Sequence, residues 1–203
     1  MLKKTILLLL VLTGIIPIAC CPENPSGPYL LKLEHIGLAQ ENFIRPSMGP
    51  HDDYLIAPNS TYAEDTLLIL MDFNFLLAVH RPAFSLQPTA LATSCDFSPH
   101  LTQLNDKIKD ITITSDHPFN EVAAGQPLNR KVVAFRDRSA PALPLTQVIA
   151  LINSLSGNEF LNSRLSTFAL VEKPTGSYKH IFSITITYES GKQETADSIP
   201  ITW

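Results

Sequence analysis

Residues 66–79, TLLILMDFNFLLAV, constrain the fold most, because apolar side chains recur at every second position over a length that suits one long strand. Side chains two apart share one face of a β-strand, and here they are Leu67, Ile69, Met71, Phe73, Phe75, Leu77 and Val79. The opposite face mixes further leucines with Asp72 and Asn74. A helix would surround both polar residues with apolar side chains, which costs more free energy. The stretch therefore predicts a central strand with one face fully buried and the other partly covered.

Several shorter segments also have the composition of strands. They are residues 29–38, 111–114, 132–135, 168–172, 182–188 and 195–203. The cleanest alternation runs from Phe182 to Tyr188, where apolar residues alternate with Ser and Thr. A turn at residues 190–192 follows, so we expect a C-terminal antiparallel hairpin. In its second strand, Trp203 is in phase with two isoleucines, and we expect it to pack against the core.

One segment has helical rather than strand periodicity. In residues 144–155, PLTQVIALINSL, apolar residues recur at intervals of three and four. Pro144 suits the first helical position and Gly157 suits the stop. Residues 44–65 and 81–104 are rich in turn formers and are expected to be irregular. An α/β fold would need helices alternating with strands. We therefore expect a mainly β fold, namely an antiparallel β-sandwich with one short helix. An immunoglobulin-like arrangement is one form of such a sandwich.

The amino terminus has the pattern of a secretory signal. Lys3 and Lys4 precede an apolar run over residues 6–19, which is the order of a positive and a hydrophobic signal region. The run is shorter than the ~20 residues that a membrane-spanning helix needs. Gly14 and Pro17 also weaken a helix near its end. We therefore expect residues 1–19 to be a signal peptide rather than a permanent membrane span.

The end of this run resembles the lipobox of bacterial lipoproteins. Ile18-Ala19-Cys20-Cys21 places an aliphatic and a small residue before a cysteine. The resemblance implies cleavage before the cysteine and attachment of several acyl chains, which together make a durable membrane anchor. Cys20 is the expected lipidation site because Ala19 directly precedes it. Cys21 is the alternative, and an ordinary signal that leaves both cysteines for disulfides is another.

The residues after the cysteines suit a tether. Residues 20–28 include three prolines and a glycine and no large apolar side chain, so we expect an extended segment before a single domain over residues 29–203. No Asp directly follows Cys20, so the inner-membrane retention signal of enteric bacteria is absent. We therefore expect lipid anchoring in the outer membrane of the cell envelope, on either its surface or its periplasmic face.

Length and charge exclude some classes of partner. Removing 19 residues from the 203-residue chain leaves 184, which is ample for a hydrophobic core. The removed segment holds two lysines and no acidic residue, so 13 Lys+Arg remain against 19 Asp+Glu, a formal charge of −6. A mildly acidic chain without basic clusters argues against nucleic-acid binding. It also argues against attraction to anionic lipid headgroups.

Only one cysteine lies beyond the amino terminus, at Cys95. If Cys20 is lipidated, Cys21 is spare, and the oxidising envelope would allow a disulfide between Cys21 and Cys95. The alternative is a buried free thiol at Cys95. Three cysteines cannot build a disulfide scaffold, and the absence of a C-x-x-C motif argues against a zinc site.

Part of the chain resembles a known group of proteins. Residues 90–129 contain Ala-Leu-Ala before Cys95, then DKIKDITITSD, PFN, AAG and LN, and the C-terminal part reads YKHIFSITITYESGKQETADSIPI. These segments resemble a family of uncharacterised lipoproteins from gut and environmental Gram-negative bacteria. The resemblance implies a lipidated envelope protein. It implies no activity, so no catalytic residue is carried over.

Few polar groups suggest chemistry. His51-Asp52-Asp53 lacks the regular spacing of a calcium loop and fits a solvated loop. Asp116 and His117 follow a strand, but Ser115 would face the other way, so we expect turn hydrogen bonds there rather than a hydrolase site. The other histidines considered lack metal-ligand spacing; they are His35, His80, His100 and His180. Asp72 and Asn74 are expected to be hydrogen-bonded or to face water.

These observations predict no catalytic residue, no metal and no cofactor. We expect a non-enzymatic module that binds or supports an envelope protein or an extracellular ligand, with a membrane contact through the lipid anchor and no contact to nucleic acid. Loops on a rigid scaffold are enough for such a role. The alternatives are a structural fimbrial-type subunit that uses residues 28–43 as an exchanged strand, and an envelope hydrolase.

Overall fold

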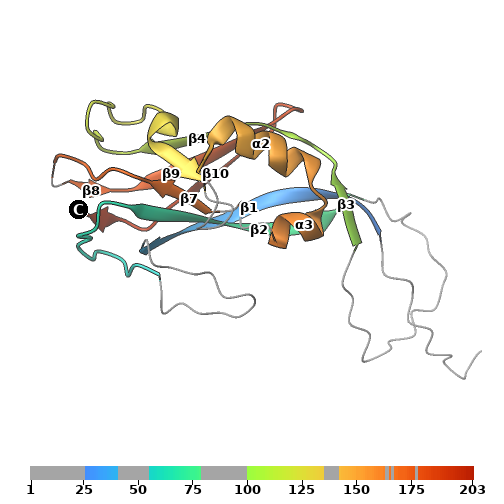
Figure 1. The fold of residues 1–203 in the computed structure, drawn as a ribbon, viewed down its shortest axis with the longest axis horizontal. Helices are drawn as coiled ribbons and strands as arrows, with labels where there is room; N and C mark the ends of the chain where they lie inside the picture. Colours follow the sequence, from blue (N-terminus) through green and yellow to red (C-terminus); the bar gives the residue numbers. More distant parts are fainter. Residues whose placement is uncertain are drawn as a thin grey trace, which may run out of the picture.

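The computed structural model describes residues 26–40, 55–78, 100–134, 142–162, 165, 167–176 and 178–203. Strands dominate this part of the chain (Figure 1). They are β1 Ser26–Gln40, β2 Leu67–Leu77, β3 His100–Leu104, β4 Ile108–Ser115, β5 Val132–Ala134, β6 Leu143–Pro144, β7 Thr167–Leu170, β8 Lys179–His180, β9 Phe182–Tyr188, β10 Gln193–Asp197 and β11 Ile201–Thr202. The helical elements are the 3-10 turn η2 Asn129–Lys131 and the helices α2 Leu145–Ser154 and α3 Gly157–Asn162.

The strands form two larger sheets and one small sheet. The large sheet has the order β3-β1-β2-β7-β5-β6, the second has the order β10-β9-β4, and β11 pairs with β8. Pairing is antiparallel except between β1 and β3, which are parallel. The predicted mainly β sandwich is therefore confirmed. Its strand numbers, six and three in the larger sheets, differ from the four and three of a constant-type immunoglobulin domain.

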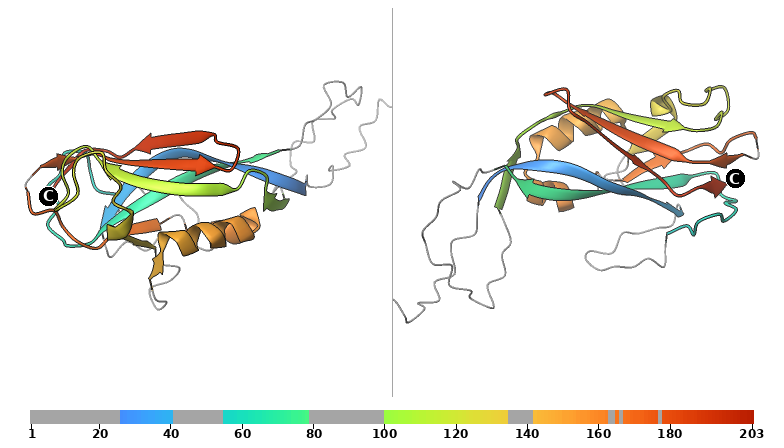
Figure 2. Two further views of the ribbon diagram at one scale, coloured as in Figure 1. Left: turned by 90° about the horizontal axis from the view of Figure 1, so that it is seen from above. Right: turned by 180° about the vertical axis from the view of Figure 1, so that it is seen from behind.

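The core lies between the two larger sheets, which are stacked as layers (Figure 2). Inward side chains of both sheets belong to one buried cluster, which includes Leu31, Leu38, Leu67, Ile69 and Met71 of the large sheet and Ile111, Ile113, Phe182, Ile184 and Ile186 of the second. Each such side chain stabilises the fold by roughly 1.5–3 kcal/mol relative to its exposed state.

Strand β2 has the two faces that its sequence predicts. Leu67, Ile69 and Met71 are fully buried on the inner face. On the outer face, Leu68 and Leu70 join a separate small cluster, whereas Leu76 is 46% exposed. The inner face is only partly buried at Phe73, Phe75 and Leu77, so the prediction of one fully buried face is confirmed for the first half of the strand.

The free edge of β4 is covered by asparagine side chains. Asn153 of α2 binds both backbone groups of Ile108, accepting from its N–H at 2.9 Å and donating to its C=O at 2.8 Å. Further along β4, Asn129 of η2 accepts a hydrogen bond from Ile113 N and donates one to Ile111 O. These amides replace a neighbouring strand, which removes an edge that could otherwise pair with another chain.

The predicted helix is confirmed as α2, but its end differs from the expectation. Gly157 is not the stop, because it opens α3. Ser156 and Glu159 form a capping box there, with Ser156 N donating to Glu159 Oε2 at 2.8 Å and Glu159 N donating to Ser156 Oγ at 3.3 Å. A Cβ at position 157 would lie 2.5 Å from Leu101 Cβ. Glycine is therefore required for the close approach of α3 to β3.

The two ends of the sandwich are formed by different strands. At one end, called here the Ser26 end, β1 begins beside the start of β3 and the end of β2. At the other, called here the Trp203 end, β8 and β11 pair and the C-terminus lies (Figure 1). The hairpin of β9 and β10 is as predicted, but the chain then leaves it, and β11 pairs with β8 instead.

Candidate functional site

A buried serine–histidine pair lies at the Trp203 end. Ser115 Oγ and His180 Nδ1 are 2.8 Å apart, and the two residues are 2% and 0% exposed. Side chains two apart share a face, so Ser115 points inward with Ile113, and His180 points inward with Phe182. The antiparallel pairing of β4 with β9 then brings the two strand ends together.

Aromatic rings enclose the His180 imidazole. Phe182 stacks on it with ring centroids 5.8 Å apart, and Phe119, Tyr178 and His117 meet it edge to face. Its Nε2 atom is buried and has no hydrogen-bond partner among the described residues. Burial lowers the pKa of His180 below its ordinary value; Asp116 partly opposes this shift and His117 adds to it. The ring is therefore neutral at pH 7.

The rim of this cluster is partly exposed. Asp116 Oδ1 accepts a hydrogen bond from Ile181 N at 2.7 Å and lies 3.1 Å from His117 Nδ1. The His117 ring stacks on Tyr178 with centroids 5.5 Å apart, and Tyr178 is 48% exposed. His117 N also donates to Ser115 Oγ at 3.3 Å. The expected turn hydrogen bond is therefore present for Ser115, whereas Asp116 binds the distant Ile181, and Ser115 also binds His180 in the core.

The combination of Ser, His and Asp invites comparison with a hydrolase. A catalytic serine must reach a substrate carbonyl, and its base is usually oriented by a third group. Ser115 is buried, and Asp116 hydrogen-bonds Ile181 N rather than the His180 ring. As placed here, the pair offers no accessible nucleophile, and its observed role is to satisfy polar atoms inside the core.

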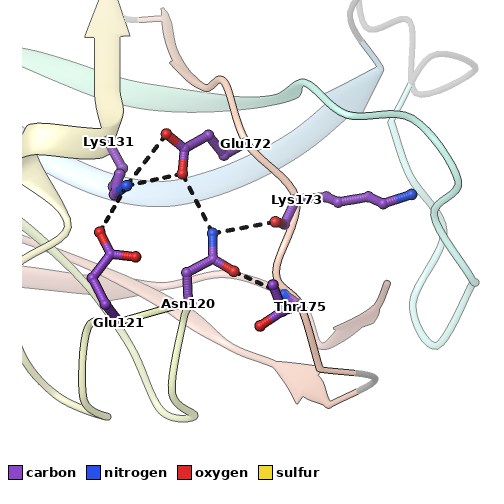
Figure 3. Close-up of polar contacts among 6 residues, drawn as sticks. All are labelled: Asn120, Glu121, Lys131, Glu172, Lys173 and Thr175. Atoms are coloured by element: carbon purple, nitrogen blue, oxygen red, sulfur yellow. Dashed lines mark hydrogen bonds and ion pairs between the residues drawn. The ribbon is translucent and has the colours of Figure 1, made fainter.

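A second polar cluster at the surface joins three segments (Figure 3). Lys131 Nζ lies 2.8 Å from Glu121 Oε1 and 2.9 Å from Glu172 Oε2. The hydrogen bond with Glu121 is the main cause of the raised pKa of Lys131. Asn120 Oδ1 accepts from Thr175 N at 2.8 Å, as a neighbouring strand would. The cluster holds the loop after β7 against the loop after β4, although exposed ion pairs contribute little stability individually.

A third polar cluster lies where β1 passes β10. Glu194 Oε2 of β10 accepts a hydrogen bond from Leu33 N of β1 at 2.8 Å. Tyr188 Oη lies 3.0 Å from the same oxygen and 2.9 Å from Leu31 O, and Lys192 Nζ is 2.6 Å from Glu194 Oε1. Burial alone would raise the pKa of this carboxyl, but the donors outweigh it and hold the pKa below its ordinary value.

Replacing Glu194 by alanine is expected to lower the free energy of unfolding by about 2 kcal/mol, because the Leu33 N–H loses its acceptor. Glu194→Gln keeps an amide oxygen for that N–H and is expected to lose less than half as much. Since the folded pKa is lowered, the stabilisation is present above the ordinary value of 4.5 and is lost as pH falls through the folded value. Urea unfolding at neutral and acidic pH measures both effects. An alanine variant as stable as wild type at neutral pH would contradict this role.

The remaining predicted polar residues have simple surroundings. Asp72 Oδ2 lies 2.6 Å from His35 Nε2, and Asn74 Nδ2 donates to Glu34 Oε1 at 3.1 Å, both on the outer face of the large sheet. This agrees with the expectation that Asp72 and Asn74 are hydrogen-bonded or face water. His100 is exposed at the start of β3.

Several predicted residues lie outside the described part of the chain. These are Cys20, Cys21 and Cys95, together with His51, Asp52, Asp53 and His80. Lipidation and the disulfide therefore stay predictions. Within the described residues, no three His, Cys, Asp or Glu side chains are grouped so as to hold a metal ion. A search of the same residues finds no helix with the length and hydropathy to cross a membrane.

The sequence contains a signal for the inward position of His180. His180 is two residues before Phe182 and continues the alternation of β9, and Ser115 continues that of β4 in the same way. Extending both patterns by one step would have placed the two side chains in the core. Glu194 had no such signal, because its role depends on its contact with a distant strand, β1.

The chain was also compared with known proteins. No model of a protein family, no curated protein sequence and no solved structure matches it.

Proposed function

We propose that the protein is an envelope lipoprotein, anchored by acyl chains on Cys20, that acts as a non-catalytic binding or scaffolding module. Its partner would be another envelope protein or an extracellular ligand. The outer membrane is the proposed location, on either face. Two features support the proposal. They are the lipobox-like residues Ile18-Ala19-Cys20 and the position of the first strand, β1.

The position of β1 is the observation that carries the proposal. β1 begins at Ser26, six residues after Cys20. Its first residues pair with both β2 and β3, and Ala78 N donates to Pro28 O at 2.9 Å. Six residues span at most about 20 Å. A lipid on Cys20 would therefore hold the Ser26 end near the membrane and direct the Trp203 end away from it.

The Trp203 end is suited to contact a partner. The loops that connect the strands at this end are held by the Lys131 cluster and by the aromatic rings around His180. Backbone hydrogen bonds, such as Tyr62 N to Thr202 O at 2.7 Å, also hold them. Loops fixed on a rigid sandwich are where binding proteins usually carry their contacts. Tyr178, Val171 and Leu55 are exposed large apolar side chains at this end, and Tyr178 is 48% exposed.

The alternatives have less support. A fimbrial-type subunit would exchange the strand within residues 28–43, but β1 pairs with β2 along the chain's own sheet from Tyr29 to Gln40 and would first have to leave it. An envelope hydrolase would need an accessible nucleophile, and Ser115 is buried. The acidic composition also argues against a nucleic-acid partner.

Membrane fractionation of two matched variants tests the proposal. Cys20→Ala is expected to move the chain from the membrane pellet to the supernatant, because no acyl chains remain. Cys21→Ala is the control and should stay in the pellet. The reverse pattern would identify Cys21 as the lipidated residue. A Cys20→Ala, Cys21→Ala double variant that remains in the pellet would contradict lipid anchoring altogether.

A further inference from the structure

We propose that His180 is a pH-sensitive latch that keeps the Trp203 end closed when neutral and releases it on acidification. The inference concerns how the fold itself responds to pH. It does not depend on lipidation, so the fractionation experiment above can fail without affecting it.

His180 lies where three parts of the chain meet. Its backbone pairs with Ile201 of β11, and its ring binds Ser115 at the end of β4. Just beyond β11, Trp203 packs edge to face on Phe119 at 5.9 Å. Phe119 in turn contacts the His180 ring at 5.8 Å. Loosening His180 therefore loosens β8, β11 and the loop after β4 together.

The surroundings of the ring compensate a positive charge only in part, through Asp116. From β4 and its loop, the polar and charged groups facing it are Ser115, Asp116 and His117. On the chain just before it, Tyr178 meets the ring edge to face, whereas the neighbouring Lys179 is exposed and its Nζ binds Asn59 Oδ1. The contacts from β9 and β11 are apolar, and they are Phe182 and Ile201.

A proton on Nε2 would remain without an acceptor in the closed state. Among the groups that face the ring, Asp116 is the carboxylate, and its Oδ1 already accepts from Ile181 N. Ser115 Oγ can accept from a protonated Nδ1 but does not reach the other side of the ring. A buried charge without a partner is strongly unfavourable, so the protonated histidine is stable only where the ring contacts water.

The direction of the pH effect follows from linkage. In the opened state His180 takes the ordinary histidine pKa of about 6.5, whereas burial lowers the pKa in the closed state. The opened state therefore binds the proton more tightly, and opening is favoured by up to about tenfold for each pH unit below 6.5. Between pH ~7.5 and ~5 the opening constant is expected to rise by up to about 30-fold.

Hydrogen–deuterium exchange on the full chain tests the latch at pH ~7.5 and ~5, after correction for the intrinsic exchange rates. Peptides over residues 115–119, 178–182 and 199–203 are expected to lose protection at the lower pH. Peptides from β1 and β2 should keep theirs. Equal protection of all these segments at both pH values would overturn the proposal.

Two variants separate His180 from other titrating groups. Ser115→Ala with His180→Phe replaces both partners of the hydrogen bond by apolar groups, a change that is often nearly neutral for stability, and should abolish the pH response. His35→Gln alters an exposed histidine, 66% accessible at its side chain, and should retain the response. A double variant that still opens on acidification would contradict the assignment.

If the double variant does not fold, the wild-type protein still decides the question. The imidazole carbon and nitrogen NMR shifts of His180 report its protonation directly. The latch requires that the ring stays neutral as long as residues 199–203 are protected. A ring that becomes protonated while these residues keep full protection would overturn the proposal.

Discussion

Replacing Cys95 by serine is expected to lower the free energy of unfolding of the oxidised protein by about 4 kcal/mol, because the closed loop of a disulfide restricts the unfolded chain. The described pairing places the start of β1 beside the start of β3. Ser26 lies opposite His100 and Gly27 opposite Leu101 in parallel register. Cys21 precedes Ser26 by five residues, and Cys95 precedes His100 by five.

Both cysteines lie outside the described residues, so the Cys21–Cys95 bond stays a prediction. A Cys21–Cys95 bond would also leave Cys20 for the lipid. The prediction thus links the disulfide to the choice of lipidated residue.

Denaturant unfolding with and without reductant measures the effect. Cys95→Ser and Cys21→Ser should be destabilised equally, and reductant should remove the difference between each variant and the wild type. A non-reduced peptide digest should contain the Cys21–Cys95 pair. A free thiol at Cys95 in the oxidised, folded protein would contradict the prediction and favour the buried thiol.

Replacing Trp203 by alanine is expected to lower the free energy of unfolding by about 3 kcal/mol. A fully buried Trp or Phe typically loses about 3–5 kcal/mol on truncation to alanine, and Trp203 is partly buried against the core. Its ring meets Tyr62 at 5.5 Å, Phe119 at 5.9 Å and Phe182 at 6.4 Å. Its Nε1 donates to Glu64 O at 2.9 Å.

A matched variant divides this effect into packing and hydrogen bonding. Trp203→Phe keeps an aromatic ring and removes the donor, so a loss of about 1 kcal/mol is expected. Thermal or urea unfolding compares the two variants with the wild type. An alanine variant within about 0.5 kcal/mol of wild type, the usual range for a surface change, would contradict the packing role.

Local alternation was enough to predict the parts of the fold that have one buried and one exposed face. It identified β2, the β9–β10 hairpin and the inward position of Trp203. Helical periodicity likewise identified α2. In each case the apolar spacing over a few residues determines which face is buried, so no knowledge of distant segments was needed.

Features that depend on distant pairing were not predicted. β3 is five residues long and is recognised only by its parallel pairing with β1. β8 has two residues and exists through its pairing with β11. The role of Glu194 arises because its carboxyl binds the backbone of Leu33 in another strand, β1. A short segment has too little local preference to reveal such partners.

The polar clusters illustrate the same limit. Ser115 and His180 each lie in phase with a strand pattern, but 65 positions separate them in the sequence. Only the order of β4 and β9 in the sheet brings them together. Lipidation is the opposite case, since its signal is local to residues 18–21 and does not depend on the fold.

The mass of the mature N-terminal peptide, measured on protein extracted from membranes, tests the central claim most directly. The account predicts a peptide that begins at Cys20, lacks residues 1–19 and carries the added mass of several acyl chains on that residue. A peptide that retains residues 1–19, or one in which Cys20 and Cys21 are both without lipid, would contradict it.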